Sequence, residues 1–172
     1  LNYKNKKIRN LDMSQIGRVL NNFELELKNG PSVKSMLIQN TNPMVVAPEH
    51  NLVRSGFSRK DLFVCVHDQF LTETAKLANI VLPATTFFEH DDFYVGGGHS
   101  YLQFGPKIIE PIAESKSNHE VICELGNLLS PGHPGFQMSL EKLIEETLLI
   151  SGYPTLSEFK KLKWVNCQPQ KK

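Results

Sequence analysis

Three apolar segments of the sequence, each typical of a buried β-strand, run directly into short polar or proline-containing stretches. In an open α/β sheet, ligands bind in the crevice beyond the carboxyl ends of the strands. Side chains that follow the strands are therefore candidates for hydrogen bonds to a ligand. The strand segments are residues 35–38, 62–66 and 80–82, and the stretches after them are Asn40-Thr41-Asn42-Pro43, His67-Asp68-Gln69 and Pro83-Ala84-Thr85-Thr86.

Asp68 has the most specific chemistry among these residues. An ionised carboxylate accepts hydrogen bonds through both oxygens and suits a partner with two adjacent donors, such as the N1–H and 2-amino edge of guanine. A helix predicted to begin near Thr72 would also offer unpaired backbone N–H groups to a phosphate. The alternative is that Asp68 caps the following turn or helix. The residues alone favour neither interpretation.

Other groups that resemble metal-binding or reactive sites do not assemble into one. The run Glu89-His90-Asp91-Asp92 has the composition of metal ligands, but adjacent loop residues rarely converge on one ion, so we interpret it as solvated charge. The three cysteines are far apart and form no Cys-x-x-Cys pair, which argues against an iron–sulfur cluster. The sequence has no P-loop and no glycine-rich dinucleotide motif after a strand. We therefore predict no catalytic residue and no metal ligand.

Strands and helices alternate around these candidate residues. Residues 62–66 are continuously apolar, as expected of a parallel strand covered on both faces. Two later helices are predicted to begin at capping boxes, in which Ser117 precedes Glu120 and Thr155 precedes Glu158. Residues 89–111, with glycines at 96–98, are predicted to form a loop. We expect one α/β domain over residues 11–165, between a frayed N-terminus (1–10) and a C-terminal tail (166–172).

Composition limits the possible partners of the chain. It has 172 residues, of which 40% are hydrophobic and 22% charged, and its net charge is +1. This balance gives no broad electrostatic field for nucleic acid or an anionic membrane. No apolar run approaches the roughly 20 residues of a membrane span, and no signal peptide opens the chain. We therefore expect no nucleic-acid partner, no membrane partner and a cytoplasmic location.

Four stretches in the same region resemble the molybdopterin oxidoreductases of the dimethyl-sulfoxide-reductase type. The similarity extends from about residue 7 to residue 164, and the run Thr72-Glu73-Thr74-Ala75 with Val81-Leu82-Pro83 is its most specific part. The resemblance implies a parallel-sheet, three-layer αβα domain of Rossmann-like type with additional C-terminal helices. The four stretches are residues 36–43, 63–75, 78–86 together with Glu89, and 111–118.

This resemblance also implies a cofactor and the residues that contact it. Enzymes of this family hold molybdenum or tungsten between two pterin-guanine dinucleotides, and this domain would bind the guanosine and phosphate end of one molybdopterin guanine dinucleotide. The domain's partners would be the remaining domains of the parent enzyme. The family's contacts fall on Asn42, His67, Asp68, His90 and Asn118.

The sequence also departs from the family pattern. Asn79 stands where an aspartate is usual, Ile112 is expected to take the place of the glycine after Pro111, and Ser115 replaces an alanine. The family's iron–sulfur segment, metal ligand and C-terminal cofactor domain have no counterpart in these residues. We therefore expect the chain alone to be inactive and to carry no cofactor. Two alternatives stay open: a stand-alone nucleotide-binding or interaction module, and a small nucleotide-binding enzyme that uses Asp68 and a histidine.

Overall fold

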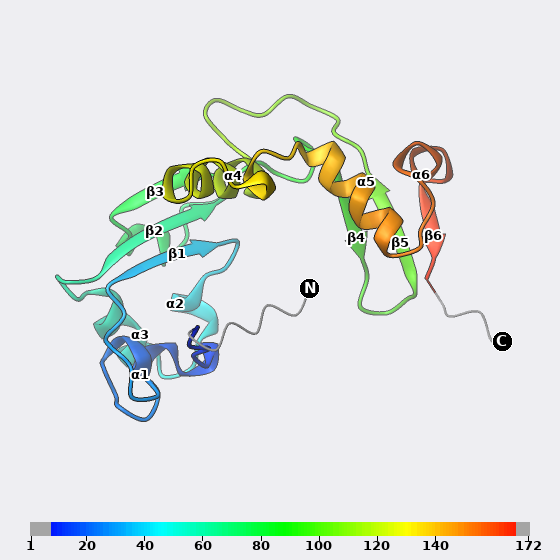
Figure 1. Ribbon diagram of the computed structural model, residues 1–172. Helices are drawn as coiled ribbons and strands as arrows, with labels where there is room; N and C mark the ends of the chain where they lie inside the picture. Colours follow the sequence, from blue (N-terminus) through cyan, green and yellow to red (C-terminus); the bar gives the residue numbers. More distant parts are fainter. Residues whose placement is uncertain (1–7, 168–172) are drawn as a thin grey trace. The chain divides into compact units, whose positions relative to one another are not determined.

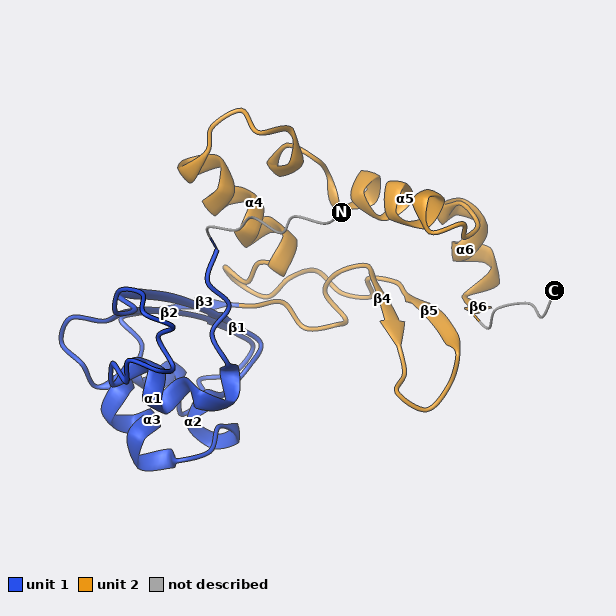
Figure 2. Ribbon diagram, turned by 60° about the horizontal axis from the view of Figure 1, so that its bottom comes forward, with its two compact units in different colours: residues 1–83 blue, residues 84–172 orange. Residues whose placement is uncertain are grey.

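The computed structural model describes residues 8–167, which form two compact units divided between Pro83 and Ala84 (Figure 2). The stretch expected to be one domain, residues 11–165, thus contains two units, and each buries a hydrophobic core of its own. Most of the predicted frayed N-terminus (residues 1–7) and of the predicted tail (168–172) lies outside the described residues.

Unit 1 is built on a parallel sheet of three strands, β1 (Ser35–Gln39), β2 (Phe63–Asp68) and β3 (Ile80–Pro83), in that order. Ile38 lies opposite Val66, which in turn lies opposite Val81, so the three strands end at the same edge of the sheet. The three predicted strands and the α/β class are confirmed. Because β1 and β2 end together, the residues that follow them are neighbours in space.

Short helices cover one face of this sheet (Figure 1). They are α1 (Ile16–Leu20), α2 (Pro43–Val46) and α3 (His50–Phe57), and two 3-10 turns, η1 (Met13–Gln15) and η2 (Ala75–Leu77), accompany them. The core beneath them contains Leu20 of α1, Val53 of α3 and Val66 of β2, all fully buried. The helix predicted near Thr72 is only the turn η2, because β3 begins at Ile80 and leaves no room for a longer helix.

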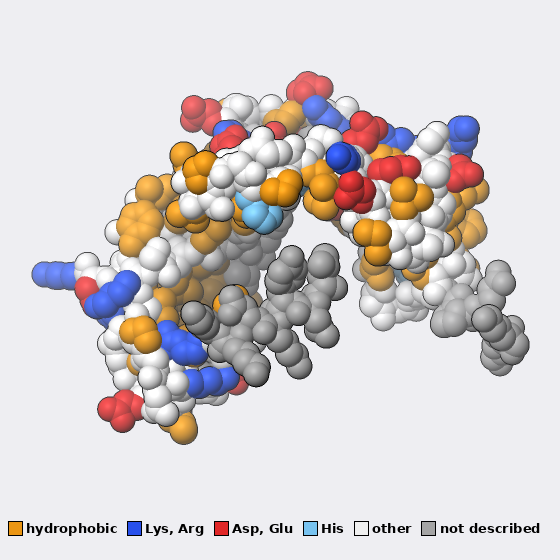
Figure 3. All heavy atoms as spheres, in the orientation of Figure 1, with side chains coloured by type: hydrophobic (Ala, Val, Ile, Leu, Met, Phe, Trp, Pro, Cys, Tyr) orange, Lys and Arg blue, Asp and Glu red, His pale blue; other side chains and the backbone are white. Residues whose placement is uncertain are grey.

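The other face of the sheet is only partly covered in the described residues, contrary to the prediction for β2. Burial alternates along this strand: Val64 and Val66 are buried, whereas Phe63 is 45% exposed and Cys65 is half-buried. Leu37 on β1 is 40% exposed. Hydrophobic side chains such as those of Phe63 and Leu37 are therefore partly exposed, and other hydrophobic side chains are also visible on the surface in Figure 3.

Unit 2 contains an antiparallel sheet that the sequence analysis did not predict. Its strands are β4 (Asp92–Val95), β5 (Tyr101–Gly105) and β6 (Trp164–Asn166), in that order. The segment predicted to be a loop, residues 89–111, therefore holds a hairpin, with the three glycines in the connection between β4 and β5. Asn166, assigned to the predicted tail, pairs with Tyr101 as part of β6.

Helices α4 (Asn118–Leu129), α5 (Leu140–Ile150) and α6 (Leu156–Leu162), with the 3-10 turn η3 (Pro134–Phe136), complete unit 2. Both predicted capping boxes are present, at the start of α4 and of α6, and the additional C-terminal helices are confirmed. The core forms where the fully buried Phe159 of α6 meets Phe93 of β4, with ring centroids 4.8 Å apart. In residues 8–167, no helix combines the length and the hydropathy needed to cross a membrane.

Candidate functional site

A cavity of about 350 Å³ opens in unit 1 where β1 and β2 end. This volume lies at the lower end of the roughly 300–1,000 Å³ usual for small-molecule sites. The structure brings two of the predicted residues, Asn42 and Asp68, to the wall of this one cavity. The complete lining is Asn40, Thr41, Asn42, Asp68 and Gln69.

The side chain of Asn42 is held from inside the unit by Thr74. Its Oδ1 accepts hydrogen bonds from the Thr74 backbone N–H (3.2 Å) and from the Thr74 hydroxyl (2.7 Å). The Thr74 hydroxyl oxygen accepts in turn from the backbone N–H of Met44 at 3.1 Å, and Thr74 is fully buried. Asn42 also precedes α2, and its backbone carbonyl accepts from Val45 and Val46. Local contacts thus fix the backbone of Asn42, and the long-range contacts with Thr74 fix its carboxamide.

Asp68 forms a local turn at the end of β2. Its Oδ1 accepts from the backbone N–H of Phe70 at 3.0 Å, so the capping role that the sequence left open is present as a turn. This bond engages one of the two carboxylate oxygens. Asp68 therefore stabilises the turn and also presents a carboxylate in the cavity wall.

His67, the residue before Asp68, does not line the cavity and is fully buried. Its Nδ1 lies 3.1 Å from Nε2 of Gln39, its neighbour across the sheet. An amide nitrogen can only donate, so with the carboxamide in this orientation Nδ1 accepts and Nε2 carries the proton. The contact between His67 and a cofactor stays a prediction.

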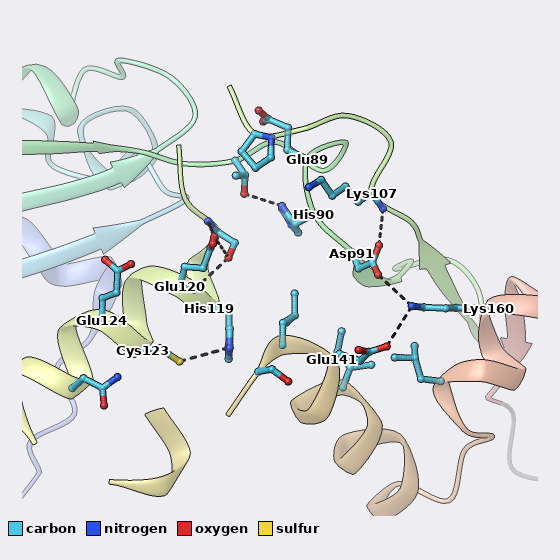
Figure 4. A pocket seen from close by; sticks show the side chains of 18 residues that line it. Glu89, His90, Asp91, Lys107, His119, Glu120, Cys123, Glu124, Glu141 and Lys160 are labelled. Atoms are coloured by element: carbon cyan, nitrogen blue, oxygen red, sulfur yellow. Dashed lines mark hydrogen bonds and ion pairs between the residues drawn. The ribbon is translucent and has the colours of Figure 1, made fainter. Parts of the chain in front are cut away.

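Unit 2 contains a larger cavity, of about 660 Å³, whose wall carries many charged groups (Figure 4). His90 comes from the segment before β4, His119 and Cys123 from α4, and Lys160 from α6. His90 Nδ1 lies 2.8 Å from the Thr85 hydroxyl. The complete lining is Thr85, Glu89, His90, Asp91, Lys107, Pro111, Ser117, His119, Glu120, Cys123, Glu124, Asn127, Ser139, Leu140, Glu141, Ile144, Leu156 and Lys160.

The two predicted residues of unit 2 therefore differ in position. His90 faces this cavity, whereas Asn118 is the exposed first residue of α4 and does not line it, although both of its neighbours do. Within residues 8–167, no three His, Cys, Asp or Glu side chains are grouped as a metal site would require.

Glu89 is not the solvated charge that the sequence suggested, because it is only 3% exposed. Its Oε2 accepts from the backbone N–H of Thr86 and its Oε1 from that of Ile112, both at 2.6 Å. These hydrogen bonds, those from Thr86 foremost, lower the pKa of the Glu89 carboxyl below its usual value. Glu89 therefore fastens the segment around Ile112 to the start of unit 2.

The backbone near Pro111 does not mark Ile112 as the position where a glycine is missing. Ile112 does not have a positive φ, whereas the next residue, Ala113, has φ +52°. This left-handed conformation favours glycine, because an L side chain strains it. Ala113, and not Ile112, is thus the position where a glycine would suit this backbone.

Sequence reasoning missed Thr74 as a part of the site. Thr74 is separated from Asn42 by 32 positions, and only the fold brings them together. The available signal was the run Thr72-Glu73-Thr74-Ala75, which contributed to the resemblance but in which we assigned only Thr72 a structural role, as a helix cap. In the structure, the Thr72 hydroxyl does accept from the backbone N–H of Ala75, at 3.1 Å.

The parallel sheet of unit 1, with hydrogen-bonding side chains around a cavity at its strand ends, defines an α/β unit with a candidate ligand site at the place where such sheets carry one. The family model for molybdopterin oxidoreductases matches residues 5–128, most of the chain. The chain belongs to the molybdopterin oxidoreductase family, which confirms the resemblance seen in the sequence.

Individual relatives agree with this assignment. The chain is 45% identical over 155 residues to "Probable oxidoreductase YoaE" of Bacillus subtilis (strain 168), covering 90% of this chain and 22% of that relative. It is 33% identical over 104 residues to the dimethyl sulfoxide/trimethylamine N-oxide reductase of Rhodobacter capsulatus, covering 59% of this chain and 12% of that relative. The chain therefore spans about a fifth of the length of YoaE and less of the reductase.

A solved structure shares the fold. Acetylene hydratase from Pelobacter acetylenicus aligns with a TM-score of 0.74 and 21% sequence identity, covering 91% of this chain and 21% of that one. The alignment includes nearly the whole chain, so the arrangement of strands and helices is that of a known protein. At this identity, the likeness concerns the fold alone.

Proposed function

We propose that unit 1 binds the guanosine end of a pterin-guanine dinucleotide, as one part of a larger molybdopterin oxidoreductase. The observation that carries this proposal is the cavity at the ends of β1 and β2, whose wall contains both Asn42 and Asp68. Family membership supplies the cofactor class, since molybdopterin is what gives the family its name. In the parent enzyme, the other domains would be the partners of this unit and would supply the redox centre.

The side chains of the cavity suit the chemistry of guanine. A carboxylate accepts from two adjacent donors, which the N1–H and 2-amino group of guanine provide. Asp68 is the acidic residue of the cavity wall, and its turn to Phe70 fixes the carboxylate at the strand end. Adenine offers no matching pair of donors on that edge. The cavity volume of about 350 Å³ suits a single base and is too small for a whole dinucleotide.

The roles proposed for His67, His90 and Asn118 are weaker in physical terms. His67 is buried, and Asn118 is exposed beside a cavity of the other unit. His90 lines that second cavity with its Nδ1 at the Thr85 hydroxyl and its Nε2 3.7 Å from Asp92, so a cofactor group there would share the ring with these two residues. We therefore propose Asp68 and Asn42 as the principal contacts, with His90 and Asn118 as contacts for cofactor groups beyond the base.

Isothermal titration calorimetry with GDP tests this function on the 172-residue chain. We expect weak binding, because the chain carries only one part of the cofactor's surroundings. Asp68→Asn keeps an oxygen for the Phe70 N–H but removes the carboxylate, and it should weaken binding by about tenfold or more, as expected for a lost charged hydrogen bond.

The matched control is Asp61→Asn. Asp61 precedes β2, at the opposite end of this strand, where it is paired with Arg59 and Lys34. The control should bind GDP as the unchanged chain does. If the unchanged chain does not bind GDP, the function is wrong for this chain. If Asp68→Asn binds as tightly as the unchanged chain, the site is wrong.

A further inference from the structure

The carboxamide of Asn42 has two chemically different ends, and the structure decides which one meets a ligand. Oxygen and nitrogen of an amide are distinguished by their hydrogen-bond partners. The end that contacts Thr74 faces two donors, the backbone N–H at 3.2 Å and the hydroxyl at 2.7 Å. Only the oxygen can accept from both. The amide nitrogen is therefore the other end of the group.

The Thr74 hydroxyl has no freedom to reverse this arrangement. Its oxygen accepts from the Met44 backbone N–H at 3.1 Å, so its single hydrogen is directed to Asn42 Oδ1. The hydroxyl and the Met44 N–H are both buried, where an unpaired donor is costly. Turning the Asn42 amide over would set its NH2 group against two donors. The hydrogen bonds from Met44 to Thr74 and from Thr74 to Asn42 form a relay, and its donors and acceptors can be arranged stably in only this direction.

We propose that Thr74 is a positioning residue that makes Asn42 a hydrogen-bond donor toward the ligand, and that this donor recognises the carbonyl oxygen of a guanine base. The inference rests on the function proposed above and adds the residue that sets its specificity. Asn42 lines the same cavity as Asp68, so the wall offers an amide donor together with a carboxylate acceptor, beside the further polar residues Asn40, Thr41 and Gln69. Guanine presents a carbonyl acceptor beside its N1–H and 2-amino donors, whereas adenine presents a donor in place of the carbonyl.

The carboxylate also argues against a phosphate as the group that Asn42 meets. Asp68 and Asn42 border one cavity of about 350 Å³, and a phosphate there would be repelled by the like charge of the Asp68 carboxylate. A neutral carbonyl oxygen suffers no such repulsion. Asn42 therefore serves the base, and the phosphates of a nucleotide lie elsewhere.

Three variants test this inference, with binding of guanosine and of GDP measured by calorimetry. Asn42→Asp keeps the oxygen that accepts from Thr74 but turns the donor into an acceptor. We expect about a hundredfold weaker binding of guanosine and of GDP alike. Thr74→Val removes the hydroxyl with little change of shape and should weaken both by roughly tenfold, about the value of one hydrogen bond. Thr74→Ser restores the hydroxyl and should restore binding.

A control separates positioning from general stability. Ile38→Val trims the core beneath β1 without touching the relay, so it lowers the melting temperature but should leave guanosine binding unchanged at a temperature where every variant is folded. If the Thr74→Val variant binds guanosine as tightly as the unchanged chain does, the inference is wrong but the proposed function stands. The inference is also wrong if Asn42→Asp weakens binding of GDP but not of guanosine, because that result would mean that Asn42 contacts a phosphate. An unchanged chain that binds neither ligand would overturn the function and the inference together.

Discussion

Polar side chains have different partners in the cavity of unit 1 and in the cavity of about 660 Å³ in unit 2. In unit 1, Asn42 and Asp68 are held by buried or local backbone partners, which leaves a defined face of each toward the cavity. In unit 2, several of the charged groups are paired with one another: Lys160 lies 3.6 Å from Asp91 and 3.8 Å from Glu141. The larger cavity therefore has more charged side chains in its wall, whereas the smaller one has polar side chains that are held in a fixed orientation.

This difference shows why volume alone does not select the functional site. A ligand that enters unit 2 must compete with ion pairs that are already formed. A ligand that enters unit 1 meets a donor and an acceptor whose own partners lie behind them, so binding costs little rearrangement. Such preorganisation is what recognition of a small planar base requires. The predictions below test how far the two units act separately in this respect.

The largest expected effect is that of Phe159→Ala on unit 2. Phe159 is fully buried and meets Phe93 edge-on, so its truncation should destabilise this unit by about 3–5 kcal/mol. Because unit 1 has a core of its own, guanosine binding there should persist. Hydrogen exchange followed by mass spectrometry should show protection lost in residues 84–167 and kept in residues 8–83.

The reciprocal control for this experiment is Val53→Ala. Val53 is fully buried in the core of unit 1, so its truncation should remove protection from residues 8–83 instead. Loss of protection across both units in Phe159→Ala would mean that they fold as one, and the comparison between two separate cavities would fail.

The next effect concerns the pH dependence of unit 2. Hydrogen bonds from Thr86 and Ile112 lower the pKa of Glu89 below its ordinary value of 4.5. A carboxyl with a lowered pKa in the folded state contributes stability that is fully present above pH 4.5 and is lost as the pH falls through the folded-state pKa. Glu89→Gln should therefore lower the melting temperature by several degrees at pH 7, since its NH2 group would meet a backbone donor, and by less near pH 3.

Glu114→Gln is the control for this measurement, because Glu114 is exposed on the same segment. It should melt like the unchanged chain at both pH values. Equal destabilisation by Glu89→Gln at pH 7 and pH 3 would show that Glu89 acts by packing and not by charge.

The sequence predicted the parts of this structure that depend on neighbouring residues. The capping boxes at Ser117 and Thr155 are local, and both formed as predicted. The strand segments ended at proline or at short polar residues, so their positions were readable from the chain. Asn42 and Asp68 share a cavity because adjacent parallel strands end at one edge, a rule that needs no further information.

Contacts between distant residues were beyond this reasoning. The hairpin of β4 and β5 requires Phe93 and Phe104 to face a core supplied by α6, which follows 50 residues later. Burial of Glu89 depends on a backbone N–H that Ile112 provides. The orientation of Asn42 depends on Thr74, a residue whose hydroxyl has no periodic pattern to mark it. The orientation of the Asn42 amide, and so which of its ends faces the cavity, could therefore be predicted only from the fold.

A smaller effect is expected from Ala113→Gly in unit 2. Ala113 is exposed and has φ +52°, a conformation in which glycine avoids the strain of a side chain. The substitution should stabilise the unit by about 0.5–1 kcal/mol in urea denaturation. Ala78→Gly is the matched control, because Ala78 has an ordinary extended backbone with φ −77°. The control should be destabilised, and a destabilised Ala113→Gly would show that this strain is absent.

The smallest effect is expected from Lys160→Met, which removes the cation between Asp91 and Glu141. Both ion pairs are solvent-exposed and longer than 3.5 Å, so their contribution should be about 0–1 kcal/mol and should fall further at high salt. The methionine keeps an unbranched hydrophobic stem but also removes the ammonium group that lies 5.6 Å from the centroid of the Phe104 ring. Guanosine binding in unit 1 should not change. A loss of guanosine binding in Lys160→Met would show that the charges of unit 2 affect the cavity of unit 1, and it would contradict the contrast between the two cavities.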